Sequence, residues 1–488
     1  MSGLNSDQNR APIYDMARRY VEENTVRFHM PGHKGRLYGD DAADLAQDMW
    51  QMDITELPDT DDLHMPQGAI MEAQRLMAEA YGADRSFLMV NGSTGGIYAM
   101  MLAACKPGDS IVVARNCHKS VINGLILAGL NPIYIWPPML QDWHITGQIR
   151  PEQVGEALEQ HPEAVAVLIT SPDYYGLCAD VAGIAGVCHQ RGVPLLVDEA
   201  HGAHFAFHES LPPSAGHCGA DIWVNSMHKT LPALTQTAVL HVRSRMVDTD
   251  RVMAGLQMAQ TTSPSYILMA SMDMARRYMA NEGRGDLGNL LGYIADLSQW
   301  LCGMGGVRMM DESIKGRSGV TFKDPTRLCL DISGLGIGGV AAEELLRVEG
   351  VQAEMADLYN VVFITTVMDN AKDFAVLKEA LIRLAASGRN AKEVYHPPVM
   401  TLPHPVQTLS PRQAALGAAE RVPLEDAAGR IAAQPIGLYP PGIPAVCPGE
   451  FIDRDTIEVL LEASARVGRV FNMGEDKMVA VVREKAYE

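Results

Sequence analysis

A lysine stands directly after a short apolar run in the segment NSMHKTLPALTQTA, residues 225–238. The run ADIWV that leads into it is typical of a buried strand, so we expect Lys229 at the carboxyl end of that strand. Burial removes water from the ammonium group and lowers its pKa, which favours the neutral amine. Because a neutral amine attacks carbonyl carbons, we predict that Lys229 is a nucleophile toward a carbonyl compound.

An aspartate occupies a similar place at the end of another apolar run, in LLVDEAHGAHF, residues 195–205. An ionised Asp198 at a buried strand end needs a partner, either a protonated ring nitrogen or a structural salt bridge. Nearby, His201, His204 and His208 have the spacing H-x-x-H-x-x-x-H, which matches no known zinc pattern. We therefore expect no metal site.

Glycines and hydroxyl residues fill VNGSTGG, residues 90–96, between a strand-like run and a helix-like run. Such a loop can bind an anion through free N–H groups, with Ser93 and Thr94 as hydroxyl donors, although a capped tight turn would look the same. Together with Asp198 and Lys229, this chain order predicts pyridoxal phosphate. Its phosphate would lie at the loop, its ring nitrogen at the aspartate, and its aldehyde in a Schiff base with the lysine.

The elements that must position these residues alternate in type between about residues 86 and 242. Short β-rich runs recur: SFLMV, SIVVA, PIYIW, AVAVLIT, PLLVD, DIWVN and TAVLHV. Helix-like stretches such as TGGIYAMMLAAC and VAGIAGVCHQRG separate them. The alternation predicts an α/β domain with a mostly parallel sheet covered by helices on both faces. Ligands of such sheets bind at the carboxyl ends of the strands, where the three motifs fall.

The chain of 488 residues is long enough for two or three domains. We predict an N-terminal arm at 1–60, the large cofactor-binding domain at 61–285, a smaller α+β domain at 286–392 and a C-terminal domain at 393–488. Two strand-like runs, RLCLDISGLG and VVFITTVMD, surround a helix-like GGVAAEELLRVEG in the smaller domain. The C-terminal domain is expected to begin with a proline-rich linker, to continue with a helix in SPRQAALGAAERV, and to end in a helix.

Composition excludes several classes of protein. Acidic residues outnumber basic ones by 59 to 40, which argues against nucleic acid as a partner. No apolar run is long enough to span a membrane, and the polar N-terminus lacks the apolar core of a secretory signal. Eight scattered cysteines without a C-x-x-C pair favour reduced thiols in a cytoplasmic protein.

Several motifs, taken together, resemble the fold-type-I ornithine/lysine/arginine decarboxylases, in the short bacterial form without an N-terminal wing domain. They are MPGHKG (30–35), NGSTGG (91–96), RNCHKS (115–120), DEAHGAHF (198–205), SMHKTLPALTQTA (226–238), TTSPSY (261–266) and YPPGIPAVCPGE (439–450). They cover almost the whole chain in the family's order. The resemblance implies an aspartate-aminotransferase-like large domain that binds pyridoxal phosphate, and a homodimer or higher oligomer.

The resemblance also implies roles for the matching residues. Lys229 would hold the cofactor, Asp198 its ring nitrogen, and His118 would stack on the ring, although a histidine at a helix start would look the same in RNCHKS. The remaining cofactor contacts would be Ala200 beneath the ring and, at the phosphate, Ser93, Thr94, Ser226 and His228. The proton that returns to the substrate Cα could come from His228, Lys229 or another group.

The substrate implied is a cationic amino acid, with arginine first and lysine or ornithine next. Glu450 could meet its distal cationic group, as could Asp53 or Glu56 from the arm of a partner subunit. An α-oxoamine synthase or aldolase-like enzyme is the runner-up, since DEAH also resembles the synthase motif, but those enzymes lack PGHKG and YPPG. The motifs are also compatible with a decarboxylase of an unusual amino acid, and with a non-catalytic regulator that binds pyridoxal phosphate.

Overall fold

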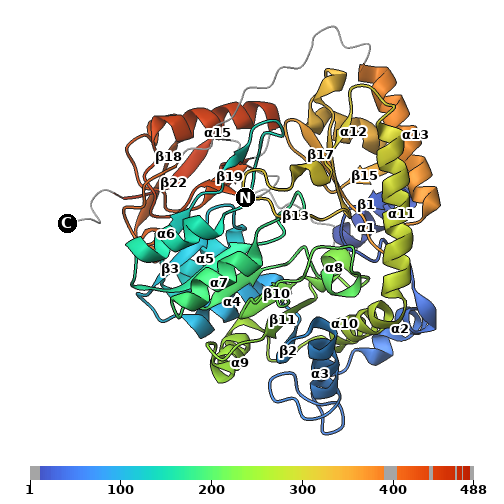
Figure 1. The fold of residues 1–488 in the computed structure, drawn as a ribbon, viewed down its shortest axis with the longest axis horizontal. Coiled ribbons are helices and arrows are strands. Elements are labelled where there is room, and N and C mark those ends of the chain that lie inside the picture. The colour runs from blue at the N-terminus through green and yellow to red at the C-terminus, as the bar shows by residue number, and fades with distance from the viewer. Residues whose placement is uncertain (1–10, 389–403, 439–442, 468–469, 475, 484–488) are drawn as a thin grey trace, which may run out of the picture.

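The computed structural model describes residues 11–388, 404–438, 443–467, 470–474 and 476–483. A seven-stranded sheet with its helices forms the largest part, and two smaller parts lie beside it (Figure 1). The end of the chain, with α15 (Arg454–Val467), lies on one side and the unit with α12 (Gly339–Val348) on the other. The proline-rich linker expected at the start of the C-terminal domain comprises residues 393–411, and most of it falls outside the described residues.

The central sheet contains all seven strands that the sequence predicts. Their order is β2-β11-β10-β9-β7-β3-β4, and only β11 runs antiparallel to its neighbours. The bounds are β2 Arg85–Met89, β3 Ser110–Ala114, β4 Asn131–Ile135, β7 Ala164–Thr170, β9 Leu195–Asp198, β10 Ile222–Asn225 and β11 Ala238–Val242. The predicted α/β fold with a mostly parallel sheet is confirmed.

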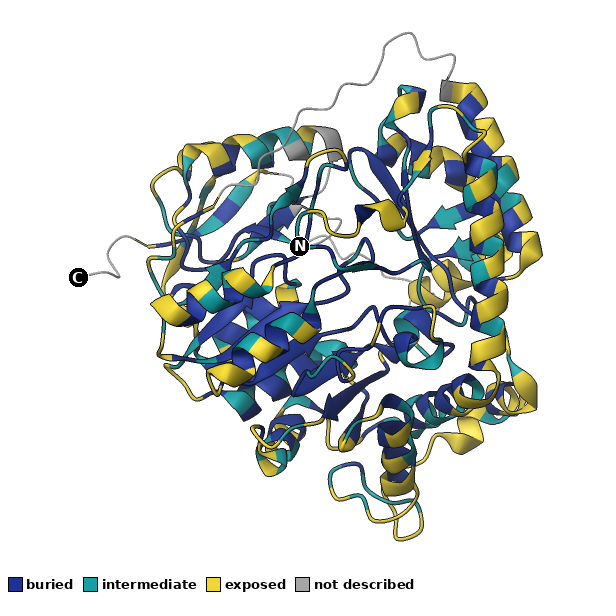
Figure 2. Cartoon of the chain, viewed as in Figure 1, coloured by how far each residue is buried: buried dark blue, intermediate teal, exposed yellow. Residues whose placement is uncertain are grey.

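Both faces of this sheet are buried, which is why its strands read as unbroken apolar runs. Side chains alternate between faces along a strand, so Ile111 and Val113 of β3 enter one core while Val112 and Ala114 enter the other. Figure 2 shows the sheet as a buried layer beneath helices whose outer faces are exposed. One face is covered by α4 (Gly92–Ala104), α5 (Lys119–Ala128) and α9 (Thr249–Ala259), and the other by α3 (Ala69–Tyr81), α6 (Pro151–Gln160), α7 (Val181–Gln190) and α10 (Tyr266–Tyr278).

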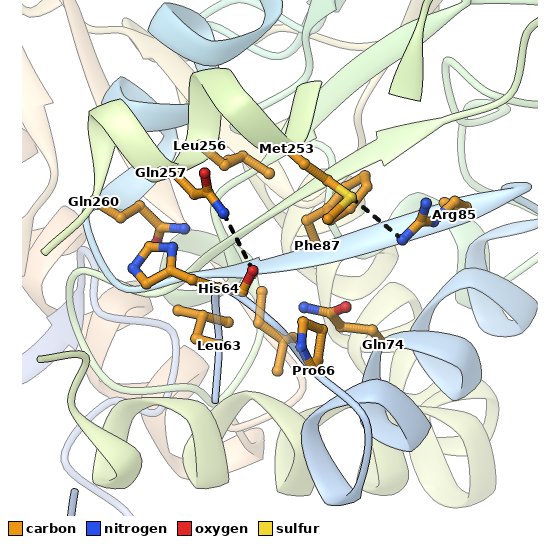
Figure 3. A pocket seen from close by; sticks show the side chains of 11 residues that line it. Leu63, His64, Pro66, Gln74, Arg85, Phe87, Met253, Leu256, Gln257 and Gln260 are labelled. Carbon is orange, nitrogen blue, oxygen red and sulfur yellow. Dashed lines mark hydrogen bonds between the residues drawn. The ribbon is translucent and has the colours of Figure 1, made fainter. Parts of the chain in front are cut away.

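The chain that follows the N-terminal arm lies beside β2, at the edge of the central sheet. Figure 3 shows His64 and Pro66 facing side chains of α9 across a narrow pocket beside β2. Gln257 Nε2 donates to the carbonyl of His64, and the His64 ring lies 2.8 Å from the carbonyl oxygen of Thr261. These contacts hold the segment that follows the arm against α9 and the residue after Gln260.

The smaller α+β unit has a four-stranded sheet in the order β12-β14-β17-β16. Its strands are β12 Arg308–Met309, β14 Arg327–Asp331, β17 Asn360–Ile364 and β16 Met355–Ala356, with α12, α11 (Arg284–Leu301) and α13 (Ala371–Gly388) beside them. The N-terminal arm contributes α1 (Pro12–Glu22), β1 (Val26–Phe28) and α2 (Gly39–Met52). Because β1 pairs in parallel with β15 (Val351–Ala353), the arm joins the smaller unit by backbone hydrogen bonds.

The C-terminal part is richer in strands than the sequence predicts. The helix expected in SPRQAALGAAERV ends early as α14 (Pro411–Leu416), and β18 (Ala419–Pro423) follows it. β18 pairs with β22 (Met478–Val482), so the described chain ends in a strand and not in α15. These two local predictions are wrong because pairing between distant segments overrides the helical preference of alanine-rich sequence. A second sheet joins β20 (Pro444–Val446), β19 (Ile436–Leu438) and β21 (Val470–Phe471).

Candidate active site

A cavity opens at the carboxyl ends of the central strands, where ligands of open α/β sheets bind. Asp198 ends β9, Thr170 ends β7, and Lys229 lies in the short helix α8 (Met227–Thr230) that follows β10. The lining residues come from the strand ends, the loops beside them, the start of α4 and the residue before β20: Ser93, Asn116, His118, Thr146, Thr170, Asp173, Tyr174, Tyr175, Asp198, Ala200, His201, Lys229 and Ile443. The structure thus brings the three sequence motifs together in one cavity.

The amine of Lys229 is held inside this cavity. Its Nζ lies 3.0 Å from Nε2 of His201. Burial lowers the pKa of Lys229, and the nearby Asp198 carboxylate opposes that shift. The amine is therefore easier to deprotonate than that of a surface lysine, as predicted from its place after the strand.

Asp198 is buried, and its Oδ1 accepts a hydrogen bond from the backbone N–H of Ala200 at 3.2 Å. Burial raises the pKa of this carboxyl group, and the charge of Lys229 lowers it. No salt bridge within the described residues neutralises Asp198 at close range. A protonated ring nitrogen is the partner that such a carboxylate lacks.

Two hydroxyl groups predicted to bind phosphate meet at one side of the cavity. Ser226 Oγ donates to Ser93 Oγ at 2.9 Å, although 133 residues separate them in the chain. Ser93 and Thr94 belong to the first turn of α4, whose N–H groups have no helical acceptor. Gly92 begins that turn with a φ of 65°, a left-handed conformation that glycine adopts without steric cost.

The hydrogen bonds of His118 and His228 define their tautomers. His118 caps α5, and its Nδ1 accepts from the N–H of Ser120, so its Nε2 carries the proton. Nδ1 of His228 lies 2.9 Å from the carbonyl of Thr237, which only accepts, so this nitrogen carries the proton and Nε2 keeps a lone pair. Burial lowers the pKa of both rings to about 4, which makes them neutral at pH 7.

Several further residues of the site were not predicted from the sequence. Asn116 and Thr170 line the cavity, and their buried side-chain polar atoms have no hydrogen-bond partner in the structure. Unpartnered buried polar groups at a cavity wall indicate contact with a bound group. Arg327, from β14 of the smaller unit, reaches Nδ1 of His201 at 3.0 Å. Asn116 lies within the motif RNCHKS and Thr170 ends an apolar run, whereas no local signal marks Arg327, because domain packing brings it to the cavity.

The three histidines considered for metal binding have separate partners. His201 contacts Lys229 and Arg327, whereas the ring of His204 lies near Asp324 and Thr326. His208 Nδ1 accepts from the N–H of Ser210. Among the described residues, no group of three or more histidine, cysteine, aspartate or glutamate side chains could hold a metal ion.

Glu450 is not among the residues that line the cavity. Its fully buried carboxylate lies 2.9 Å from Nη2 of Arg115, and the N–H of Cys447 also donates to it. Arg115 follows β3 and also donates to the carbonyl of Pro444. The pair therefore fastens the C-terminal part to the loop that carries Asn116 and His118. The substrate contact suggested for Glu450 stays a prediction.

The residues at this cavity fit pyridoxal phosphate. A strand-end carboxylate without a counter-ion, a desolvated lysine, paired hydroxyl groups at a helix start and unpartnered polar atoms on the walls are the donor set that this cofactor requires. The fold and the site together define a fold-type-I pyridoxal-phosphate-dependent enzyme.

Comparison with known proteins gives the family. The profile described as "Orn/Lys/Arg decarboxylase, major domain" matches residues 11–311, and that of the C-terminal domain matches residues 391–471. The chain belongs to the Orn/Lys/Arg decarboxylase family and is a pyridoxal-phosphate-dependent decarboxylase. It is 36% identical to "Arginine decarboxylase" of Bacillus subtilis (strain 168) over 98% of this chain and 99% of that protein. It is 37% identical to the protein of the same name from Halalkalibacterium halodurans, over 98% of each.

A solved structure supports the fold. Lysine decarboxylase A from Pseudomonas aeruginosa superposes with a TM-score of 0.76 at 20% identity, covering 96% of this chain and 82% of its own. Within the part of the chain that is described, no helix combines the length and the apolar composition that crossing a bilayer requires.

We expect Lys229→Ala to abolish both the visible absorbance of the Schiff base and turnover, because no other amine occupies this position. Absorbance spectra and borohydride reduction followed by peptide mass spectrometry measure the linkage. Lys106→Ala, which changes an exposed lysine, is the control and should leave both unchanged. Retention of a reducible cofactor linkage in Lys229→Ala would contradict the assignment.

We expect Glu450→Gln to lower the free energy of unfolding by about 3–5 kcal/mol, because it leaves the buried Arg115 without a counter-charge. Urea unfolding measures the loss, and the Arg115→Met, Glu450→Leu double variant should recover part of it. Glu72→Gln, in the exposed pair with Arg75, should change nothing measurable. Unchanged stability with a raised KM for basic amino acids would instead support the predicted substrate contact.

Proposed function

We propose that this enzyme decarboxylates arginine to agmatine, with lysine and ornithine as the next candidates. The proposal is based on the similarity of this chain, over nearly its full length, to two proteins named arginine decarboxylase. The lysine decarboxylase structure is below 25% identity and supports the fold alone.

Pyridoxal phosphate, when bound, supplies the electron sink that takes up the electrons of the broken Cα–carboxylate bond. In this proposal Lys229 holds the cofactor, and Asp198 forms an ion pair with its ring nitrogen. Ser93, Thr94 and Ser226 hold its phosphate, with His228 beside them. These roles are consistent with the burial of Asp198 and with the hydrogen bond between the two serines.

His118 and Ala200 would enclose the cofactor ring from its two faces. The neutral His118 suits stacking, since a protonated imidazole would be repelled by a protonated ring. His228 Nε2 keeps a free lone pair, so His228 is one of the groups proposed to return the proton to Cα. Burial of these groups also keeps bulk water away from the reacting carbon.

Recognition of the substrate's cationic head group requires a carboxylate. The acidic side chains that line the cavity are Asp173 and Asp198. Asp173 already accepts hydrogen bonds from Gln148 and from the N–H groups of Tyr175 and Leu177, and burial raises its pKa to about 7. We therefore propose that the head-group carboxylate comes from the arm of a second copy, where Asp53 and Glu56 lie.

The N-terminal arm exposes large apolar side chains, as surfaces that bind another protein do. Among its exposed side chains, Trp50 is 90% and Ile13 is 80% accessible, and α1 buries no residue at all. Large exposed apolar side chains concentrated on one segment favour association. We propose that the arm packs on a second copy of this chain and forms at least a homodimer.

Light scattering should give at least twice the mass of the chain, and Trp50→Glu should shift it toward the monomer with loss of activity. Leu416→Glu changes an exposed leucine in the C-terminal part and should leave the mass unchanged. A fully active wild-type monomer would refute both the dimer and the shared site.

A substrate panel tests the activity. We expect the holoenzyme to release carbon dioxide fastest from arginine, with agmatine identified by mass spectrometry and slower release from lysine and ornithine. Turnover of a thioester or a β-hydroxy amino acid without carbon dioxide release would contradict the proposal. Absorbance that no amino acid alters would instead favour a regulator that binds the cofactor without turning over.

We also propose a cytoplasmic location. All eight cysteines are free thiols, which is typical of proteins in a reducing compartment.

A further inference from the structure

Three side chains form a continuous chain of contacts at the cofactor lysine. Arg327 Nη2 lies 3.0 Å from Nδ1 of His201, and Nε2 of the same ring lies 3.0 Å from Nζ of Lys229. Arg327 belongs to β14 of the smaller unit, His201 to the loop after β9, and Lys229 to α8. Arg327 and His201 are buried, and the contact between His201 and Lys229 faces the cavity.

The donors and acceptors in this chain admit one neutral arrangement. A guanidinium group only donates hydrogen bonds, so Nδ1 of His201 must accept and carries no proton. A neutral imidazole then carries its proton on Nε2 and donates it toward Lys229. An ammonium group also only donates, whereas a neutral amine has a lone pair. Lys229 can accept this hydrogen bond only in its neutral form.

The surrounding charges decide whether this arrangement holds. Asp198 and Glu354 favour the ammonium form of Lys229, while burial and the charge of Arg327 oppose it. Burial and the charge of Arg327 lower the pKa of His201, and an ammonium form of Lys229 would lower it further, so the imidazole does not take a second proton. Nε and Nη1 of Arg327 have no hydrogen-bond partner among the described residues, although the buried carboxylates of Asp173 and Asp324 interact with its charge.

We infer that Arg327 fixes His201 in the tautomer protonated at Nε2, and that His201 thereby holds the free Lys229 as a neutral amine ready to capture the cofactor's aldehyde. His201 and Arg327 are positioning residues for this lysine. A neutral Lys229 contributes a lone pair and no proton, so the proton that returns to Cα comes from another group. This inference rests on the proposed function, since it concerns the same lysine.

The pH dependence of amine labelling tests the inference without substrate. The full chain, freed of cofactor, is treated with trace acetic anhydride at a series of pH values, and mass spectrometry follows each lysine. Lys106 and Lys372 are exposed internal references. We expect Lys229 to titrate about two or more pH units below them. If Lys229 titrates together with the references, the inference is wrong whatever any variant does.

A double-mutant cycle separates the tautomer from the charge of Arg327. Removing that charge raises the Lys229 midpoint in any background. In Arg327→Met the proton of His201 can also move to Nδ1, and Nε2 then accepts from the ammonium. We therefore expect Arg327→Met to raise the pH midpoint of Lys229 labelling in both backgrounds. The rise should be about one pH unit larger when His201 is present than in the His201→Leu background. Equal shifts in the two backgrounds would overturn the inference.

The conservative variant Arg327→Lys keeps a group that only donates and should retain the low midpoint. Arg276→Met removes another largely buried arginine, from α10, and should leave Lys229 unchanged. Because the readout is protonation of an amine, the inference can fail while arginine is still decarboxylated. It can equally hold in an enzyme that prefers another substrate.

Discussion

The site depends on keeping a lysine amine out of water without a full counter-charge. Lys229 sits beyond a strand buried on both faces, where an ammonium group is costly. The charge of Asp198 partly offsets the cost of burying an ammonium group at Lys229. The contact with His201 can instead be made by the neutral amine. Removal from water therefore makes this amine easier to deprotonate than that of a surface lysine.

Two buried arginines connect the three parts of the molecule around that cavity. Arg327 extends from the smaller unit to His201, behind the lysine. Arg115 extends from the loop after β3 to Glu450, so the C-terminal part braces the wall that carries His118. The guanidinium of Arg115 donates to Glu450 and to the carbonyls of Pro444 and Ala445, whereas that of Arg327 contacts His201 through Nη2. The three parts are therefore held together at the edges of the site.

The central sheet was predictable because its signal is local. Strands buried on both faces appear as apolar runs of four to seven residues, and all seven were found from the sequence. The C-terminal part was less predictable. Its alanine-rich segment favours a helix, yet residues 419–423 pair with 478–482, some sixty residues further on. Sequence patterns that depend on a distant partner carry little local information.

The sequence by itself determined the chemistry at the strand ends. Lys229, Asp198 and Ser93 each follow or precede a recognisable element, and parallel strands bring such ends together by topology alone. Only the tertiary structure decided what surrounds them. Arg327 reaches the site because the smaller unit packs beside it. Glu450 forms an ion pair with Arg115, because a buried carboxylate requires a nearby positive charge. Contacts between units depend on packing, which no local spacing encodes.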